Sequence, residues 1–449
     1  MSDQTAQAPE ASPASQPKRS MFQSLELDIR LLGMIGAFFV IAAGFHLYTG
    51  FSRAGFSLGM FTEGTFLTPR NLFNLSIQTA SVAIMATGMV FIIVMRHIDL
   101  SVGALLCTTS AVMAMTQTSV LPDMFNLPLG HPMIPWIAIV AGLLAGVIVG
   151  SLQGWLIGYQ LIPAFIVTLG GFLIWRNVGW FMTDGATIGP LDPTFQLFGG
   201  ISGTLGEGWS WIIGGLASIA AVFLLFSARR TRVSHDFPVK PIGAEVAIGA
   251  IVVAAILGFI AVLNAYEVPE RVIERDFADY GCATAENCTA SYGLPISVIV
   301  LLVVAIVMTV IAQRTRLGRY IFATGGNPDA TKLTGVNTRL LTVKIFAIMG
   351  VLCAIAAIVA SARQTYHTND IGTLDELRVI AAAVIGGTAL AGGIGTIYGA
   401  IIGALIMQSL QSGMAMVGVD APYQNIVVGA VLVLAVWVDI QYRKHTGAK

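Results

Sequence analysis

Hydrophobic residues occupy long uninterrupted runs along almost the whole chain, and short polar segments connect them. Twelve runs can be delimited, at 31–49, 72–95, 98–118, 134–158, 162–182, 209–227, 243–263, 295–311, 341–361, 377–392, 394–416 and 422–440. Most of them are close to the roughly 20 residues that a helix needs to cross the hydrocarbon core of a bilayer. The pattern therefore predicts an all-α polytopic membrane protein with about 10–12 transmembrane or half-membrane helices.

One run differs from the others because it is short and is followed directly by glycines. Run 377–392 leads into Gly392, Gly393 and Gly395. Such a segment forms either a re-entrant half-helix or a broken span, because non-helical backbone is tolerated at membrane depth where protein surrounds it. The sequence leaves the number of crossings open between 377 and 416.

The charges of the connecting segments indicate the side of the membrane on which each segment lies. Lys and Arg are enriched in cytoplasmic loops. Segments 228–242 and 312–340 are basic, as is the C-terminal tail, whereas 183–208 and 264–294 are acidic. One alternating topology satisfies this distribution, with both termini in the cytoplasm, an even number of crossings and 264–294 as an external insert.

Composition agrees with a membrane protein and indicates no nucleic-acid partner. Of 449 residues, 55% are hydrophobic and only 11% are charged, and the formal net charge is zero. Soluble domains carry roughly 25% charged residues. Residues 1–20 are rich in Ala, Pro, Ser and Gln, which predicts a disordered cytoplasmic tail. We expect residues 21–449 to form a single transmembrane domain.

Two cysteines lie in the acidic insert, in the sequence GCATAENCT. Cys282 and Cys288 can form a small-loop disulfide if the insert faces an oxidising compartment. Metal binding is disfavoured, because no histidine or second cysteine pair lies nearby.

The basic segment 312–340 contains the signals of a short capped helix. Asn327 suits the N-cap, and Pro328 suits the first helical position, where its missing N–H has no partner to lose. Asp329 places negative charge at the positive end of the helix dipole, and Gly335 suits a left-handed residue after the last turn. About two turns are not stable alone in water. The helix therefore docks either on its own protein or in a groove of a partner.

A few polar residues lie within or next to the apolar runs. Asp99 is a functional candidate, because a carboxylate at membrane depth is costly. It also suits the N-cap of a helix that begins at Leu100 or Ser101. Gln408 either lines a path or bonds between helices. For Arg176, near the end of its run, the sequence favours a side chain that reaches out to the outer interface.

The centres of the runs contain almost no Asp, Glu, Lys or His, which disfavours an ion-driven secondary carrier. No G-x-x-x-x-G-K-[ST] motif occurs, so we expect no ATP site on this chain. No Ser/His/Asp set and no HExxH motif indicates an enzyme. The sequence predicts neither a metal nor a bound cofactor.

Five segments of the chain resemble the permease subunits of bacterial ABC sugar importers, in the branch that includes the ribose, galactose and xylose systems. They are IDLSVGALL (98–106), IPAFIVTLGGFLIWR (162–176), ATGGNPDATKLTGV (323–336), VIGGTALAGGIGTIYGAIIGALIMQSLQSGM (384–414) and YQNIVVGAVLVLAVWVD (423–439). The C-terminal part of this resemblance is strongest to the xylose-type permease. It implies a multi-pass protein of the bacterial inner membrane that carries a pentose or hexose inward.

The resemblance also implies partners and site residues. Two copies of such a permease form the pathway, a separate subunit binds and hydrolyses ATP on the cytoplasmic face, and a periplasmic binding protein delivers the sugar. The coupling segment would dock on the ATPase through Gly326, Asn327, Pro328, Asp329 and Ala330. The pathway candidates that match family segments are Asp99, Ser101 and Gln408. A partner-free sugar channel or facilitator is the alternative, and it would need no docking helix.

Overall fold

The computed structural model describes residues 29–237, 239–276 and 289–446. In this part of the chain, eleven helices are long and apolar enough to cross a membrane, which confirms the all-α polytopic fold. They are α2 (Ile29–Ala54), α4 (Pro69–Val94), the continuous helix Val102–Phe125, α7 (Ile134–Gly158), α8 (Ala164–Thr183), α10 (Gly206–Ser234), α11 (Ile242–Asn264), α13 (Ile296–Arg314), α16 (Thr338–Gln364), α18 (Ile397–Met416) and α19 (Ala421–Thr446).

Shorter helices complete the described part of the chain. The continuous helix Val102–Phe125 consists of α5 (Val102–Met115), the π-helical turn η1 (Thr116–Val120) and α6 (Leu121–Phe125). The remaining short helices are α3 (Gly59–Thr62), α9 (Pro193–Gln196), α12 (Glu270–Asp276), α14 (Arg316–Gly326), α15 (Pro328–Leu333) and α17 (Asp375–Ile385). The predictions for the tail 1–20 and for Cys282 and Cys288 lie outside the described residues.

The chain divides into two compact units. The smaller one, in its described part, covers 214–257 and contains most of α10 and α11. Arg229 at the end of α10 pairs with Glu245 at the start of α11, with 2.7 Å between Nη1 and Oε2, so this unit is a helical hairpin closed by an ion pair. The larger unit holds 29–213 and the residues from 258 onward, and both sites described below lie in it.

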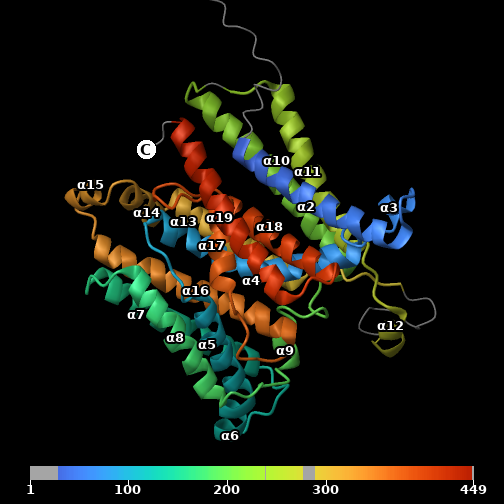
Figure 1. Ribbon diagram of the computed structural model, residues 1–449, viewed down its shortest axis with the longest axis horizontal. Coiled ribbons are helices and arrows are strands. Elements are labelled where there is room, and N and C mark those ends of the chain that lie inside the picture. Colours follow the sequence, from blue (N-terminus) through green and yellow to red (C-terminus); the bar gives the residue numbers. More distant parts are fainter. Residues whose placement is uncertain (1–28, 238, 277–288, 447–449) are drawn as a thin grey trace, which may run out of the picture. The chain divides into compact units, whose positions relative to one another are not determined.

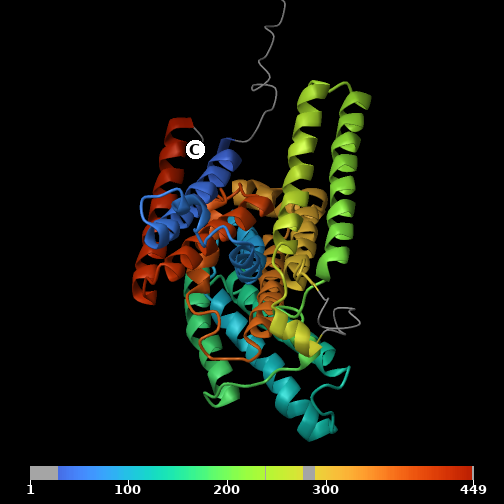
Figure 2. The same cartoon turned by 90° about the vertical axis from the view of Figure 1, so that its right-hand side faces the viewer.

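Helix α4 forms the centre of the larger unit. It packs against α13, α16, α17 and α18, and its second half, from Thr79 to Val94, is buried almost without interruption (Figures 1 and 2). A helix that is apolar on every face is expected in such a central position. The α4 residues that line the cavity described below, Ile77, Gln78, Ser81 and Val82, lie near the middle of the helix, where this buried stretch begins.

Helices α7 and α16 pack backbone to backbone (Figure 1). Glycines recur at every fourth position of α7, at Gly142, Gly146, Gly150, Gly154 and Gly158. A Cβ atom added to Gly146 would meet the carbonyl group of Gly350, and one added to Gly150 would meet the carbonyl group of Phe346. Small residues allow this close approach of helices in membranes, so the sequence of α7 determines which helix it packs against.

The run that the sequence left ambiguous contains a half-membrane helix. Helix α17 has 11 residues, which is about 16 Å, while the hydrocarbon core measures about 30 Å. Irregular segments precede and follow it, at 365–374 and 386–396. The first lies against α5, where the His367 ring bonds to the hydroxyl of Ser110 at 2.9 Å. In the second, the amide of Gly393 donates to the carbonyl of Val94 at 3.0 Å.

Helix α17 and its two irregular flanks thus take the place of one span. The first flank starts beside α5, and the second reaches the last residue of α4. Irregular backbone of this kind is tolerated at membrane depth because protein surrounds it. Eleven long helices and this interrupted passage give the even number that the loop charges require. The cytoplasmic position of both termini stays a prediction.

Candidate functional site

A polar cavity of about 330 Å³ opens between α4, α16, α17 and α18. Its lining includes four glutamines and four charged residues, namely Gln78, Gln364, Gln408, Gln411, Arg363, Asp370, Asp375 and Arg378. A volume in this range suits a small molecule. Because amides, carboxylates and guanidinium groups all bond to hydroxyl groups, the lining suits a polyhydroxylated ligand better than an apolar one.

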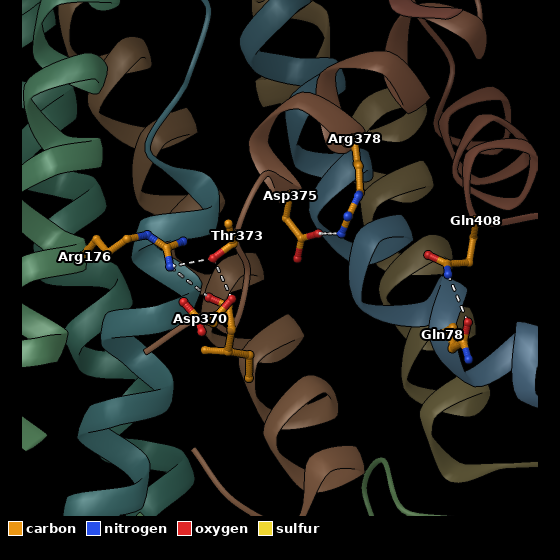
Figure 3. A network of polar contacts seen from close by, with 8 residues as sticks. Gln78, Arg176, Asp370, Thr373, Asp375, Arg378 and Gln408 are labelled. Atoms are coloured by element: carbon orange, nitrogen blue, oxygen red, sulfur yellow. Dashed lines mark hydrogen bonds and ion pairs between the residues drawn. The ribbon is translucent and has the colours of Figure 1, made fainter. Parts of the chain in front are cut away.

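Two of the glutamines bond to each other across the cavity (Figure 3). The Nε2 atom of Gln408 on α18 donates to Oε1 of Gln78 on α4, at 3.0 Å. Each amide has two donor hydrogens and an acceptor oxygen, so this bond uses only part of their capacity. Gln408, a pathway candidate from the sequence, therefore lies in the cavity with hydrogen-bonding groups to spare.

An ion pair lies in the wall formed by α17. Nη1 of Arg378 lies 2.9 Å from Oδ1 of Asp375, and both side chains are largely buried (Figure 3). The sequence analysis missed these residues because Asp375 precedes the apolar run and Arg378 lies at its edge. The sequence feature that could have identified them is a pair of opposite charges three residues apart, which places both side chains on one face of a helix.

Arg176 on α8 holds the segment before α17 in place. Its Nη1 atom donates to the carbonyl of Asn369 at 2.8 Å. The same atom donates to Oγ1 of Thr373 at 3.0 Å (Figure 3). The expectation that Arg176 reaches the outer interface was wrong, because its guanidinium group instead binds a main-chain carbonyl group and a hydroxyl group of an irregular segment. Asp370, Gly372 and Thr373 of this segment line the cavity, and Gly372 can offer it only main-chain groups.

The other two pathway candidates lie in a closed polar cluster away from the cavity. Oδ1 of Asp99 accepts hydrogen bonds from the amide of Ser101 at 2.8 Å and from its hydroxyl at 2.6 Å. Nε2 of Gln153 on α7 donates to Oγ of Ser101 at 2.9 Å. Asp99 and Ser101 are at most 1% exposed, and neither lines the cavity. The structure thus separates them from Gln408.

Asp99 also differs from the capping residue that the sequence predicts. Helix α5 begins at Val102, so Ser101 occupies the N-cap position and its own side chain caps no helical amide. Asp99 instead fixes the turn before the helix by bonding to Ser101. The carboxylate is satisfied locally, which accounts for its burial in an apolar region.

The capped helix of the basic segment is α15, and its geometry is confirmed. Oδ1 of Asn327 accepts a hydrogen bond from the amide of Ala330 at 3.0 Å, and Pro328 occupies the first turn. Asp329 lies in the first turn and is 93% exposed, and Gly335 has a φ of +84°. Among the expected coupling residues, Gly326, Asn327, Asp329 and Ala330 are exposed and Pro328 is half-buried.

A cleft of about 650 Å³ lies beside α15, between it and the ends of α4, α7 and α16. Four basic residues line it, Arg96, His97, Lys332 and Arg339, and no Asp or Glu is among its described lining residues. Burial lowers the pKa of the His97 imidazole, so this ring is neutral at pH 7. The other three side chains give the cleft a permanent positive charge.

Arg96 connects the end of α4 to the residues just before α15. It has a left-handed backbone with φ +64°, uncommon for a residue with a side chain. Its Nε and Nη2 atoms donate to the carbonyls of Gly325 and Gly326, each at 2.8 Å. These carbonyls are at the C-terminal end of α14, where a cation is favoured. The residues just before α15 are thus tied directly to the end of a core helix.

Two helices extend from the cleft to the cavity. In α4, Gln78 and Val82 line the cavity, while Met95 and Arg96 just beyond its end line the cleft. In α16, the first turn lines the cleft and the last two turns line the cavity. Because α16 has 27 residues, it bridges about 40 Å. A displacement at one site therefore has a direct route to the other.

No group of three or more His, Cys, Asp or Glu side chains that could hold a metal ion occurs among the residues that the structure describes.

Comparisons with known proteins agree with this arrangement. Residues 71–436 match the family described as branched-chain amino acid transport system / permease component. The chain is 34% identical to the xylose transport system permease protein XylH of Haemophilus influenzae, over 94% of this chain and 100% of that protein. It is 35% identical to XylH of Escherichia coli K12, over 86% and 88%. It is 30% identical to the ribose import permease protein RbsC of E. coli K12, over 83% and 87%. No solved structure matches the chain significantly.

Proposed function

The chain belongs to the family of branched-chain amino acid transport system permease components, and from this premise we propose that it is the membrane-spanning subunit of an ATP-driven sugar importer. Its cargo is xylose or a related pentose or hexose, and it works in the bacterial inner membrane. The observation that carries the proposal is the pair of helices, α4 and α16, that line both the polar cavity and the basic cleft beside α15.

The chemistry of the cavity favours a sugar over a branched-chain amino acid, although the family description mentions the latter. An aliphatic side chain needs an apolar pocket, because burying it against charges and amides gains little. The cavity instead offers four glutamine amides and the Asp375–Arg378 ion pair. The names of the relatives, which refer to xylose and ribose, support the same choice.

A separate ATPase subunit drives the transport from the cytoplasmic side. It docks on α15 through Gly326, Asn327, Pro328, Asp329 and Ala330, and ATP binds to that subunit. Its movement displaces α15, and Arg96 passes the displacement to the end of α4. The cavity then alternates between outward-facing and inward-facing forms.

A periplasmic binding protein supplies the sugar, and two copies of the chain form the assembly. Specificity can therefore lie largely outside the membrane, so the cavity needs to hold the sugar only weakly. Gln408 contacts the sugar in this proposal, whereas Asp99 and Ser101 keep the start of α5 in position.

Reconstitution tests the proposal. The chain would be placed in liposomes with the ATPase subunit and the sugar-binding protein of the same importer, and uptake of labelled xylose, ribose and leucine would be measured with and without ATP. We expect ATP-dependent uptake of xylose or ribose. Uptake by the chain alone without ATP would favour a facilitator, and preferential uptake of leucine would refute the sugar assignment.

A further inference from the structure

The basic cleft beside α15 is strongly one-sided in its charge. Lys332 comes from α15, Arg339 from the first turn of α16, and Arg96 from the segment after α4, so three separate elements direct cations to one place. Within the described lining the charge is not balanced by any carboxylate. Asp329 is outside the lining, and its 3.7 Å contact with Lys332 is made by a carboxylate that is 93% exposed.

Exposed leucines accompany these cations. Leu333, at the end of α15, is 89% exposed, and Leu161, in the lining of the cleft, is 68% exposed. Solvent exposure of two leucines beside a charged cleft is typical of a protein interface, in which an apolar contact is surrounded by polar ones. A small anion would leave Leu333 uncovered, whereas a protein partner can cover it while also meeting the cations.

We propose that this cleft receives an Asp or Glu side chain of the ATPase subunit. Leu333 enters an apolar recess on the ATPase subunit, next to that acidic side chain. The inference rests on the proposed function and extends the docking surface from Gly326–Ala330 to Lys332, Leu333 and Arg339. Guanidinium and ammonium groups form their strongest hydrogen bonds with carboxylates. Complementary charge of this kind sets both the orientation of a partner and the rate at which it associates.

Charge reversal with a matched control tests the proposal. The double variant Lys332→Glu/Arg339→Glu would be compared with Arg316→Glu/Arg319→Glu, which changes charge equally on exposed residues of α14 that do not line the cleft. Binding of the ATPase subunit to each chain in nanodiscs would be measured in increasing salt. We expect the affinity of the first variant to fall about tenfold or more, and that of the second to change less than about threefold.

The outcomes separate the inference from the proposed function. If the unaltered chain binds no ATPase subunit, the proposed function fails. If it binds and both double variants weaken binding equally, or neither does, the cleft is not the acceptor and the inference is overturned.

Cross-linking identifies the contact chemically. A carbodiimide joins an amine to a carboxylate that touches it, so we expect an amide bond between Lys332 and an acidic residue of the ATPase subunit. Lys332→Arg keeps the charge but cannot form this bond, so it should retain the partner and lose the cross-link. A cross-link only to Asp329 within the chain, in a complex that is otherwise intact, would refute the proposal.

Discussion

Replacing Asn327 by Ala should weaken binding of the ATPase subunit without disturbing the transmembrane helices. The side chain of Asn327 accepts one hydrogen bond, from the amide of Ala330 at 3.0 Å. Loss of such a cap costs about 1 kcal/mol, within a range of about 0.5–2 kcal/mol. Helix α15 has only six residues, so it has little stability of its own to offset this loss.

The expected change in affinity follows from these numbers. If only the helical form of α15 binds, the apparent dissociation constant rises as the helical fraction falls. A loss of about 1 kcal/mol corresponds to about fivefold weaker binding, and the range of about 0.5–2 kcal/mol corresponds to about 2- to 30-fold. Titration of the ATPase subunit against the chain in nanodiscs measures this directly.

Two further variants make the result specific. Asn327→Asp should restore most of the affinity, because Asp caps helices about as well as Asn. Thr315→Ala removes the cap of α14, which accepts from the amide of Gly318 at 3.2 Å. Helix α14 is held in addition by Arg96 and by the buried Ile321, so binding should hardly change. Equal affinities for Asn327→Ala and the unaltered chain would refute the reasoning.

Three other predictions concern the packing and the cavity. In thermal unfolding in detergent, the variant Gly146→Ala should be less stable than Gly170→Ala by about 1–3 kcal/mol. The added methyl group meets the backbone of α16 at Gly146 but finds open space at Gly170. Both variants gain the same helix propensity, so the difference between them reports the contact. Equal melting temperatures would contradict backbone contact between α7 and α16. Gln408→Leu should slow ATP-dependent sugar uptake about fivefold, because about 1 kcal/mol of hydrogen bonding to the sugar is lost. Binding of the ATPase subunit should not change. Unchanged uptake would show that Gln408 is not part of the pathway. Arg378→Met should destabilise the protein by about 3 kcal/mol, since it leaves the Asp375 carboxylate unpaired. The double variant Arg378→Met/Asp375→Asn should recover most of this lost stability. A double variant as unstable as Arg378→Met alone would contradict this prediction.

Local signals in the sequence predicted local structure well. The cap of α15 could be predicted because Asn327, Pro328 and Gly335 act on backbone atoms within a few residues of themselves. Hydropathy likewise predicted the long helices, since the thickness of the bilayer sets the length of each run. At 377–392 the same signal was ambiguous, because the irregular flanks of α17 depend on contacts with α5 and α4, which lie far away in the sequence.

The site itself was less accessible to sequence reasoning. Asp99, Ser101 and Gln408 looked equivalent as polar residues in apolar surroundings, yet only Gln408 reaches the cavity. Polarity indicates that a side chain needs a partner, but the partner is chosen by helix packing. For the same reason Arg176 was assigned to the interface, although its partners are a main-chain carbonyl group and the hydroxyl of Thr373 in the segment before α17.

The irregular segment 365–374 contributes Gly372 to one wall of the cavity, and a glycine can offer only main-chain groups there. Amide and carbonyl groups are the same whatever the side chain, so substitutions leave the hydrogen-bonding character of this wall in place. Evolution or engineering toward another sugar must therefore work mainly on the opposite wall, where Gln78 and Gln408 lie. One half of the cavity is thereby fixed by the fold, and the other half is free to diverge between relatives that carry different sugars.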